Sequence, residues 1–506
     1  MIRRGRAPRV IIGGYVFRVL QDLSLATLGT SGIPHDTRNL FVVLSRMPSV
    51  DLTGLLAEAG AGLTSKIPLG GRGGRPDYYA LSSFFAAISG NRVTEPFLGL
   101  GRTGEAIDGF IGRLRRFGMA DVPGDLYGDV IWRLYFSKSL PAADRADVLA
   151  RPFKATNLNI RVMLDRLALP AFCAAKLDTR GYDFLITSDS RPVSISPGTI
   201  KLMRYYDPIP MLLPDTMGHI APVRQHYMLT KRAARDGHFV CISEPTEREL
   251  LTLFPQVAGR TATIPCTLGA FRSEDTRGPT LHELARVRLS GASLSGKPDG
   301  PADTSRVLAA AKLAPDTRYI MGLSTIEPRK NFEGLILAWQ RVRRECDPNL
   351  KLVIVGRPGW RYDNVLAAMR PHVLDGGLLH LQDLTVAETR ALYARAACFV
   401  SPSYAEGFGY PPLEALQCGT PPVLSDIAAH RWVCGDAALY CDPYDPDDIA
   451  DKIRRLVAGD GAPAARDALL RAAPAVLKRY SADTIASQWE ELFGRLKKGE
   501  RLSNQA

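Results

Sequence analysis

Residues 397–419 read ACFVSPSYAEGFGYPPLEALQCG, and this stretch decides the fold of the second half of the chain. Its apolar start, residues 397–400, has the length and composition of a short buried strand. A loop with Gly407 and Gly409 follows, and prolines then open a helix that a glycine closes, which is the usual asymmetry of helix ends. A strand, a loop and a helix in this succession indicate a parallel α/β sheet.

Strand-like and helix-like segments alternate on both sides of this stretch. Helical periods cover residues 331–346 and 386–397. Short apolar runs typical of buried strands cover residues 319–323, 352–355, 378–381, 397–400 and 422–424. Because strands that alternate with helices of this length form β-α-β units, we predict a Rossmann-like domain over residues 306–480.

The first half of the chain gives a weaker pattern. Residues 9–14, 182–189 and 238–244 resemble strands, and the last of them leads into a helix. Residues 75–175 carry helical patterns without clear strands between them. We therefore predict a second Rossmann-like domain over residues 1–270, enlarged by a helical insertion.

Two further segments lie outside these domains. Residues 271–305 are small and polar, a composition that buries little apolar surface, so we expect a linker or a mobile loop. Residues 481–506 contain an amphipathic helix with Ser481 as its N-cap, which either packs on its own domain or crosses back to the first. Its apolar face consists of Ile485, Trp489, Leu492, Phe493 and Leu496.

Length and charge narrow the functional class. The chain has 506 residues, 46% of them hydrophobic, which suits two or three globular units. No run approaches the roughly 18 apolar residues of a spanning helix, and the N-terminus does not resemble a signal peptide, so we expect a cytoplasmic protein. The net charge of +12 favours anionic partners. Without an RNP-like aromatic pattern or zinc-finger spacing, we expect no nucleic acid partner.

The loop after residues 397–400 has the features of an anion site. It joins the carboxyl end of a strand to a helix N-terminus, where backbone N–H groups and the helix dipole attract a pyrophosphate. Glu406 in the loop and Glu414 in the first helical turn could reach opposite ends of one ligand. Alternatively, Glu414 only complements the helix dipole and Glu406 is solvated.

A second strand–loop–helix turn, residues 322–331, reads GLSTIEPRKN. Arg329 and Lys330 adjoin its helix N-terminus, where the dipole disfavours cations. Two cations at this position are reasonable if an anion lies between them. Otherwise they are two solvated surface charges.

From residue 322 to residue 453, the chain resembles the nucleotide-sugar half of family 4 glycosyltransferases. The resemblance rests on GLSTIEPRKN, VGRPGW, the stretch from LQDLTVAE to PPVLSD, and AALYCDPYDPDDIADKI, in this order. Its most specific element is the Glu-x7-Glu spacing of Glu406 and Glu414. The resemblance implies a GT-B architecture of two Rossmann-like domains facing across a cleft. It also implies metal-independent transfer with retention of configuration, and a nucleoside-diphosphate sugar as donor without any further cofactor.

The resemblance assigns donor-side roles residue by residue. Glu414 matches the glutamate that hydrogen-bonds the ribose hydroxyls, and Glu406 matches the one near the donor sugar and its leaving oxygen. The backbone of Gly407, Phe408 and Gly409 would hold sugar hydroxyls and the distal phosphate.

The cations complete this donor side. Lys330 matches the lysine that neutralises the pyrophosphate, with Arg329 beside it, and Leu384 lies near where such enzymes hold the base. Many relatives carry an arginine six residues before the lysine, where this chain has Ser324, so Lys330 and Arg329 should bear more of the pyrophosphate binding. Fixed cations stabilise the charge that builds on the departing diphosphate. In the family's favoured mechanism that phosphate also acts as the base, so no enzymic nucleophile is required.

The acceptor side is less distinct. Residues 30–33 look like the glycine loop that borders the acceptor, and Tyr206 replaces the histidine of a segment usually written His-Asp. The histidine that some relatives place opposite the sugar has no obvious counterpart, and Asp189 is the nearest catalytic candidate. The acceptor-side candidates are Gly32, Ile33, His35, Tyr206 and Asp207.

Three other signals have plainer interpretations. Residues 99–104 satisfy G-x-G-x-x-G, but the preceding strand is poor, so a cap or surface loop is favoured over a dinucleotide site. Residues 70–75 read GGRGGR, so we expect a flexible basic loop, which alternatively lies near an anionic acceptor. Residues 445–448 resemble an acidic metal cluster, yet they suit the cap of the next helix better, so we predict no metal.

A membrane surface is a further candidate partner. Residues 107–117 carry an apolar stripe among arginines, which together with residues 131–138 could dock on an anionic membrane. The alternative is ordinary core packing. Because many relatives extend lipid-linked glycans and the net charge agrees, we hypothesise peripheral contact with the inner face of the membrane.

The sequence therefore predicts a retaining glycosyltransferase that acts on a glycan or lipid-linked acceptor in surface polysaccharide biosynthesis. Relatives with EPRKN often use GDP-mannose, so mannose is the favoured sugar. The alternatives are a GT-B nucleotide-sugar epimerase, against which the Glu-x7-Glu pair argues, and a non-catalytic subunit that binds a sugar nucleotide.

Overall fold

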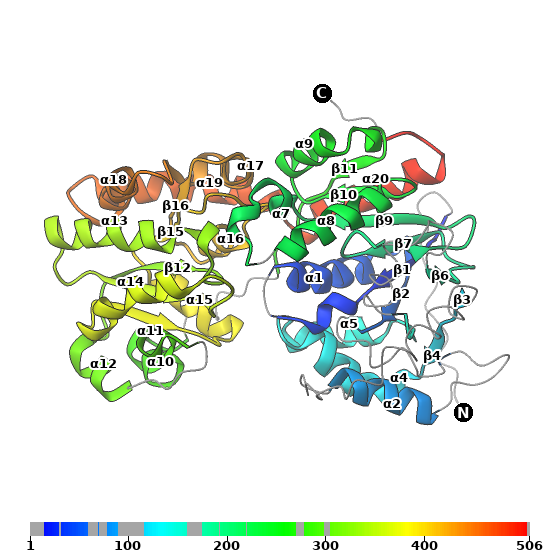
Figure 1. The fold of residues 1–506 in the computed structure, drawn as a ribbon, viewed down its shortest axis with the longest axis horizontal. Coiled ribbons are helices and arrows are strands. Elements are labelled where there is room, and N and C mark those ends of the chain that lie inside the picture. The colour runs from blue at the N-terminus through cyan, green and yellow to red at the C-terminus, as the bar shows by residue number, and fades with distance from the viewer. Residues whose placement is uncertain are drawn as a thin grey trace.

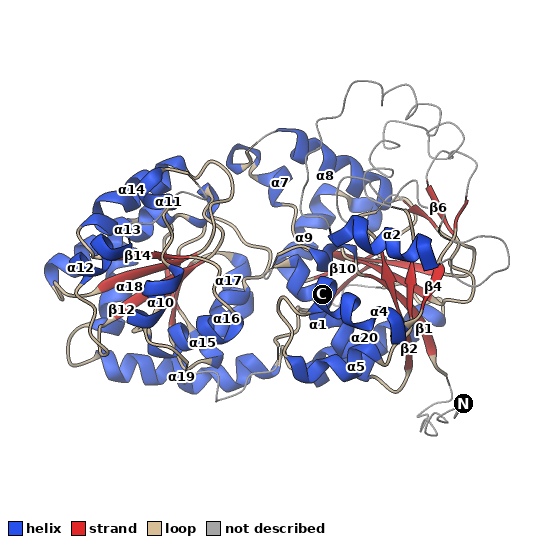
Figure 2. Ribbon diagram, turned by 90° about the horizontal axis from the view of Figure 1, so that it is seen from below, coloured by secondary structure: helices blue, strands red, loops and turns tan. Residues whose placement is uncertain are grey.

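The computed structural model describes residues 15–29, 32–58, 69, 78–89, 116–158, 175–191, 193–218, 220–269, 278–297 and 304–502. These residues form two lobes, each built around its own largely parallel sheet (Figures 1 and 2). The α/β class and the two facing Rossmann-like units expected from the sequence are confirmed.

The first domain contains an eight-stranded sheet in the order β11-β10-β9-β7-β1-β2-β5-β4, parallel except where β4 meets β5. A smaller parallel sheet has the order β3-β6-β8. The strands are β1 (Phe17–Asp22), β2 (Val50–Leu56), β3 (Arg116–Phe117), β4 (Ala120–Val122), β5 (Phe153–Ala155), β6 (Ala175–Leu177), β7 (Phe184–Thr187), β8 (Val193–Ser194), β9 (Ile200–Tyr205), β10 (His238–Cys241) and β11 (Thr261–Thr263). The helices are α1 (Ile33–Arg46), α2 (Tyr78–Ser89), α4 (Gly124–Ile131), α5 (Arg145–Leu149), α7 (Ile209–Leu212), α8 (Ile220–Ala233) and α9 (Glu244–Leu253).

The first-domain expectations are met unevenly. β7 and β10 lie within two predicted strands, and helices α2, α4 and α5 lie within the predicted helical insertion. The strand predicted at residues 9–14 lies outside the described residues. The other strands described in this domain were not predicted. Strands β1, β2 and β9 have six or seven residues, but polar residues interrupt their apolar runs, and β4 and β5 have only three residues each, too few to show an alternating pattern.

The second domain contains a six-stranded parallel sheet in the order β14-β13-β12-β15-β16-β17. All five predicted strands are present, and only the three-residue β17 was missed. The strands are β12 (Tyr319–Leu323), β13 (Lys351–Val355), β14 (Leu378–Leu381), β15 (Phe399–Ser401), β16 (Pro422–Ser425) and β17 (Leu439–Cys441). The helices are α12 (Thr304–Ala311), α13 (Phe332–Glu345), α14 (Asp363–Leu374), α15 (Val386–Arg395), α16 (Tyr410–Gln417), α17 (Ala428–Cys434), α18 (Pro446–Val457) and α19 (Ala462–Lys478).

Residues 278–297 correct the expectation of a linker or mobile loop over residues 271–305. They form α10 (Leu281–Arg288) and α11 (Ala292–Ser295) on the second domain. Thr280 and Glu283 make reciprocal bonds in a capping box, which fixes the start of α10. The small polar composition concealed an apolar helix face buried in the second core, formed by Leu281, Leu284, Ala285 and Ala292.

The last helix, α20 (Ala482–Lys497), leaves the second domain and packs on the first (Figure 1). The Ser481 hydroxyl accepts a backbone N–H of its first turn, as predicted. The ring of Phe493 lies 5.5 Å from that of Phe17 and 4.6 Å from that of Phe184, between centroids. Of the two placements considered for this helix, the structure has the one that crosses back.

This packing predicts that Phe493→Ala destabilises the first domain. The ring is fully buried, and loss of a buried phenyl ring costs about 3–5 kcal/mol of unfolding free energy. Denaturant unfolding of the full chain measures the loss. Glu490→Ala, on the exposed side of the same helix, should cost almost nothing. Equal stability of the two variants would show that α20 does not contribute to this core.

Candidate functional site

The donor-side candidates meet at the carboxyl edge of the second sheet. One predicted loop, residues 402–409, follows β15, and the other, residues 324–331, follows β12. These two strands are hydrogen-bonded neighbours. Because the carboxyl ends of neighbouring parallel strands lie together, the fold joins two segments that are far apart in the sequence.

Glu406 bridges the two predicted cations. Its carboxylate accepts hydrogen bonds from Lys330 Nζ at 2.5 Å and from Arg329 Nη1 at 2.9 Å. The Nε of Arg329 also pairs with Glu327 at 2.7 Å. These side chains are between 2% and 19% exposed, so they form a buried network. The alternative interpretation, in which Glu406, Arg329 and Lys330 are solvated surface charges, is wrong.

Charge pairing fixes the protonation of this network. Burial alone would raise the pKa of Glu406, but Lys330 and Arg329 outweigh it and hold that pKa well below its usual range. Burial, and then the charge of Arg329, lower the pKa of Lys330. Glu406 is therefore a carboxylate in the position where the sequence predicts an anion between cations. A phosphate entering the site would compete with it for the same N–H donors.

Glu414 lies in the second turn of α16, not in the first as expected, because the helix already begins at Tyr410. The hydroxyl of Tyr393 donates to its carboxylate at 3.4 Å, and burial raises its pKa. The influence of a helix dipole fades after the first turn, so complementing the dipole does not explain this residue.

Gly407 is a point of contact between the two domains. A Cβ at this residue would lie 2.3 Å from the carbonyl oxygen of Tyr206 and 2.9 Å from Cβ of Asp207, so a side chain does not fit. Its own carbonyl accepts hydrogen bonds from Ser243 Oγ at 2.7 Å and Thr246 Oγ1 at 3.2 Å. The predicted donor loop therefore meets the predicted acceptor-side segment. Sequence analysis did not single out these two hydroxyls; the serine at the start of α9, which is its N-cap, is the signal that could have indicated them.

A buried carboxylate ties the domains together beside this contact. Asp36 accepts hydrogen bonds from Arg204 Nε at 2.9 Å, Tyr206 Oη at 2.9 Å and Tyr410 Oη at 3.1 Å. Burial would raise the pKa of Asp36, but Arg204 holds it below its usual value. Sequence analysis did not find Asp36, because Arg204 and Tyr410 lie 168 and 374 residues away along the chain.

The predicted acceptor residues at the start of α1 reach the same interface. Gly32 is the N-cap with a φ of 65°, and Ile33 is the first helical residue. The ring of His35 lies edge-on to that of Tyr410, with 5.1 Å between centroids. Burial, and then the charge of Arg38, lower the pKa of His35 to about 4, so the ring is neutral at pH 7. The other two residues of the expected glycine loop lie outside the described residues.

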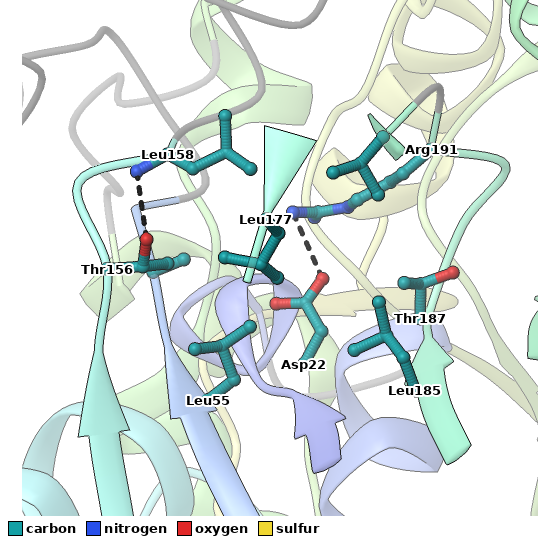
Figure 3. A pocket seen from close by; sticks show the side chains of 10 residues that line it. Asp22, Leu55, Thr156, Leu158, Leu177, Leu185, Thr187 and Arg191 are labelled. Carbon is teal, nitrogen blue, oxygen red and sulfur yellow. Dashed lines mark hydrogen bonds and ion pairs between the residues drawn. The ribbon is translucent and has the colours of Figure 1, made fainter. Parts of the chain in front are cut away.

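Asp189 is held by Arg191 on the first domain. The Nε of Arg191 donates to Asp189 at 2.5 Å, while its Nη1 pairs with Asp22 at 3.0 Å. Asp22 and Arg191 border a cavity of about 20 Å³ at the carboxyl ends of first-domain strands, which has room for about one water molecule (Figure 3). No contact within the described part of the chain joins Asp189 to Glu406, so its catalytic role stays a prediction.

The other donor-side candidates are Ser324, Leu384, Phe408 and Gly409. The N–H of Ser324, just after β12, donates to the carbonyl of Val355 at 3.0 Å. Leu384 precedes α15 and packs against the second core. The ring of Phe408 is buried in that core, so only its backbone is available to a ligand. Gly409 caps α16 with a φ of 93°, a conformation that favours glycine.

The structure tests some of the remaining sequence predictions. Asp445 caps α18 by accepting the N–H of Asp447 at 2.8 Å, as predicted. Residues 70–75, 99–104 and 107–115 lie outside the described residues. Within residues 131–138, Ile131, Tyr135 and Phe136 are fully buried in the first core, whereas Arg133, Ser137 and Lys138 are exposed, so membrane contact by this segment stays a prediction.

The described residues contain no group of three or more His, Cys, Asp or Glu side chains that could hold a metal ion. None of the helices in these ranges is long and apolar enough to cross a membrane.

Comparison with known sequences identifies the second domain. Residues 306–473 match the family model for glycosyl transferases group 1. O-antigen chain mannosyltransferase B of Escherichia coli is 36% identical over 163 residues, which are 32% of this chain and 42% of that protein. O-antigen chain mannosyltransferase RfbU of Salmonella typhimurium is 37% identical over 128 residues, which are 25% of this chain and 35% of that protein. The chain thus spans less than half the length of these relatives.

Solved structures share the fold at low sequence identity. Sucrose-phosphate synthase from Thermosynechococcus elongatus has a TM-score of 0.55 at 14% identity, covering 96% of this chain and all of that one. The Anabaena protein HepE, crystallised in complex with UDP, has a TM-score of 0.51 at 11% identity, covering 95% of this chain and all of that one. The two facing Rossmann-like domains form a GT-B fold, so the predicted architecture is confirmed.

The buried carboxylate generates a graded prediction. Asp36→Asn leaves Arg204 without its counter-charge and should cost about 3–5 kcal/mol of unfolding free energy. Tyr410→Phe removes one hydrogen bond to this carboxylate and leaves the charged partner in place, so it should cost about 1 kcal/mol. Urea unfolding near neutral pH measures both.

The pH dependence has a definite sign. Because the folded-state pKa of Asp36 is lowered, its stabilisation is present above the ordinary aspartate pKa and is lost as the pH falls through the lowered value. The difference between wild type and Asp36→Asn should therefore shrink only in acid. If Asp36→Asn costs no more than Tyr410→Phe, the carboxylate does not hold this interface.

Proposed function

We propose that this chain is a retaining, metal-independent glycosyltransferase that uses a nucleoside-diphosphate sugar and needs no further cofactor. The observation that carries the proposal is the buried bridge of Glu406 between Lys330 and Arg329. A departing diphosphate gains negative charge, and cations already fixed in a buried site stabilise that charge without reorganisation. The N-terminus of α13, directly after Lys330, adds N–H groups with the same preference for an anion.

We propose two positions for the Glu406 side chain, one with the cations as its partners and one with the donor sugar. In the structure its carboxylate occupies Lys330 and Arg329. We propose that the donor diphosphate takes these two partners and that Glu406 then turns to the donor sugar and its leaving oxygen. Glu414, in the helix that follows the Glu406 loop, binds the ribose hydroxyls. The backbone around Leu384 holds the base.

The acceptor is proposed to enter from the first domain. Tyr206 and Asp207 lie against Gly407, so an acceptor bound there would be next to the donor sugar. Gly32 and Ile33 border the same interface through α1. With the departing phosphate as the base, the reaction needs no nucleophile from the protein.

The sequence relatives support a choice of substrate. Two of them are O-antigen chain mannosyltransferases, from Escherichia coli and Salmonella typhimurium. We therefore favour GDP-mannose as donor and a glycan or lipid-linked acceptor in surface polysaccharide biosynthesis, on the cytoplasmic side of the membrane.

Helix α8 is the surface that we propose for peripheral contact with anionic lipid. Ile220 is 72% exposed and Tyr227 is 42% exposed, and Arg224 and Lys231 follow them at the spacing of one helix face. The Nζ of Lys231 lies 5.4 Å from the centroid of the Tyr227 ring. Apolar side chains flanked by cations on one face suit the headgroup region of a bilayer.

Substitution of the cluster tests the catalytic proposal. Lys330→Ala and Glu406→Gln should each lower kcat/KM for GDP-mannose about 100- to 1000-fold, because each removes a fixed charge at the reacting bond. The measurement is GDP release together with mannose transfer to a lipid extract, and NMR of the product reports its anomeric configuration. Lys498→Ala, at an exposed lysine, is the matched control.

Other outcomes of this assay would identify the alternatives. Interconversion of the sugar without transfer would indicate an epimerase. Binding without turnover by the wild type, under all acceptors, would indicate a non-catalytic subunit. Full activity of Lys330→Ala would contradict the assigned role of the cluster.

Charge reversal tests the proposed membrane face. Arg224→Glu/Lys231→Glu should weaken sedimentation with phosphatidylglycerol vesicles at least tenfold, since each basic residue contributes about 1 kcal/mol at an anionic surface. Arg471→Glu/Lys478→Glu changes the net charge equally at exposed residues of α19 and should bind almost as wild type. Equal weakening by both pairs, or no sedimentation of the wild type, would contradict α8 as the contact.

A further inference from the structure

His430, in α17, has a buried ring nitrogen that lacks a partner. The residue is 1% exposed, and its Nε2 has no hydrogen-bond partner among the described residues. Buried polar atoms are nearly always paired, so an exception requires an explanation. Burial lowers the pKa of His430 to about 4, and the ring is therefore neutral at pH 7. In a neutral imidazole one nitrogen donates and the other accepts, so the tautomer decides what Nε2 can bind.

Ser425 determines this tautomer. Its hydroxyl donates to the carbonyl oxygen of Ser403 at 2.5 Å, so toward His430 it can only accept. Nδ1 of His430 lies 3.0 Å from that hydroxyl oxygen and 3.2 Å from the carbonyl oxygen of Ser425. Both neighbours of Nδ1 are acceptors, so Nδ1 carries the proton. Nε2 consequently presents a lone pair and needs a hydrogen-bond donor.

The lone pair lies beside the donor loop. A Cβ added to Gly409 would be 3.7 Å from Nε2 and 3.6 Å from Cδ2 of His430. Because residue 409 is a glycine, no side chain at that position lies between this buried nitrogen and the loop. The ring is also close enough to Glu406 and Lys330 for their charges to act on its pKa, which the first raises and the second lowers. His430 therefore adjoins the cluster that carries the proposed function.

Because Nε2 of His430 is a neutral hydrogen-bond acceptor, its ligand must supply a hydrogen-bond donor. A phosphate oxygen is itself an acceptor and cannot satisfy Nε2 in this tautomer. A sugar hydroxyl can donate to it, and the donor sugar is the part of the ligand that carries several hydroxyls next to the diphosphate. The diphosphate already has cationic partners in Lys330 and Arg329.

We propose that His430 is a specificity-determining residue that accepts a hydrogen bond from a hydroxyl of the donor sugar. Ser425 is a positioning residue, which acts through the tautomer that it imposes. The inference rests on the proposed function, and it adds a sugar contact from α17 that neither sequence motif contains.

Two ligands and two variants separate this contact from the rest of the site. GDP contains the diphosphate alone, and GDP-mannose adds the sugar. His430→Asn keeps a polar group near Ser425 but has nothing at the position of Nε2. It should weaken GDP-mannose binding about tenfold in calorimetric titration and leave GDP binding unchanged, since one hydrogen bond is lost. His430→Gln, whose amide oxygen extends toward the position of Nε2, should recover part of the loss.

A series of deoxymannose analogues of GDP-mannose identifies the hydroxyl. Removal of the contacted hydroxyl should weaken binding to the wild type and have no further effect on His430→Asn. Removal of any other hydroxyl should affect both proteins equally. Melting temperatures of the variants, measured without ligand, report whether the core around α17 is intact.

Every other pattern overturns the proposal. If His430→Asn weakened the binding of GDP and GDP-mannose equally, Nε2 would contact the phosphates or serve only the stability of the fold. Unchanged binding of both ligands, or wild type that binds them equally well, would show that Nε2 does not contact the sugar. Failure of the wild type to bind either ligand would instead overturn the proposed function.

Discussion

The carboxylate of Asp36 is buried where the two domains meet, and it accepts hydrogen bonds from Arg204, Tyr206 and Tyr410. Two of these partners belong to the first domain, and the third is the first residue of α16 in the second. A buried charge without its partners is costly, so α1, the end of β9 and the start of α16 must come together. The same approach puts Gly407 against Tyr206, where only a glycine fits. The interface and the candidate site are therefore parts of one packing arrangement.

Within this arrangement the candidate site has a charged part and a neutral part. Lys330 and Arg329 are fixed cations, and the Glu406 carboxylate balances their charge. Beside this cluster in space, burial keeps His430 neutral, and Ser425 fixes its tautomer. The anionic part of a ligand would thus be bound by cations, and its hydroxyl-bearing part would face a neutral hydrogen-bond acceptor. Burial produces both effects: it strengthens pairing between opposite charges, and it disfavours a charge that has no partner.

Local sequence patterns predicted most of the second domain, because its strands are short apolar runs and its loops carry glycine and proline. The bridge between Lys330 and Glu406 could not be read from spacing, since the two residues are 76 positions apart and meet only through neighbouring strands. Asp36 and His430 gave no signal, because a lone polar residue on a helix acquires meaning only from its tertiary partners. The prediction of a linker over residues 271–305 was wrong for residues 278–297, because their small polar composition conceals a capping box and a buried apolar helix face.

The central claim is that the cluster around Glu406 is a diphosphate site, and binding of nucleoside diphosphates tests it most directly. Thermal unfolding of the full chain in the presence of GDP, UDP, ADP, CDP and dTDP would compare the five bases in one experiment. The account predicts that at least one of them, at 100 times its Kd, stabilises the protein by about 2.7 kcal/mol. If none of the five shifted the unfolding transition, the cluster would be a structural ion network and the account would be contradicted.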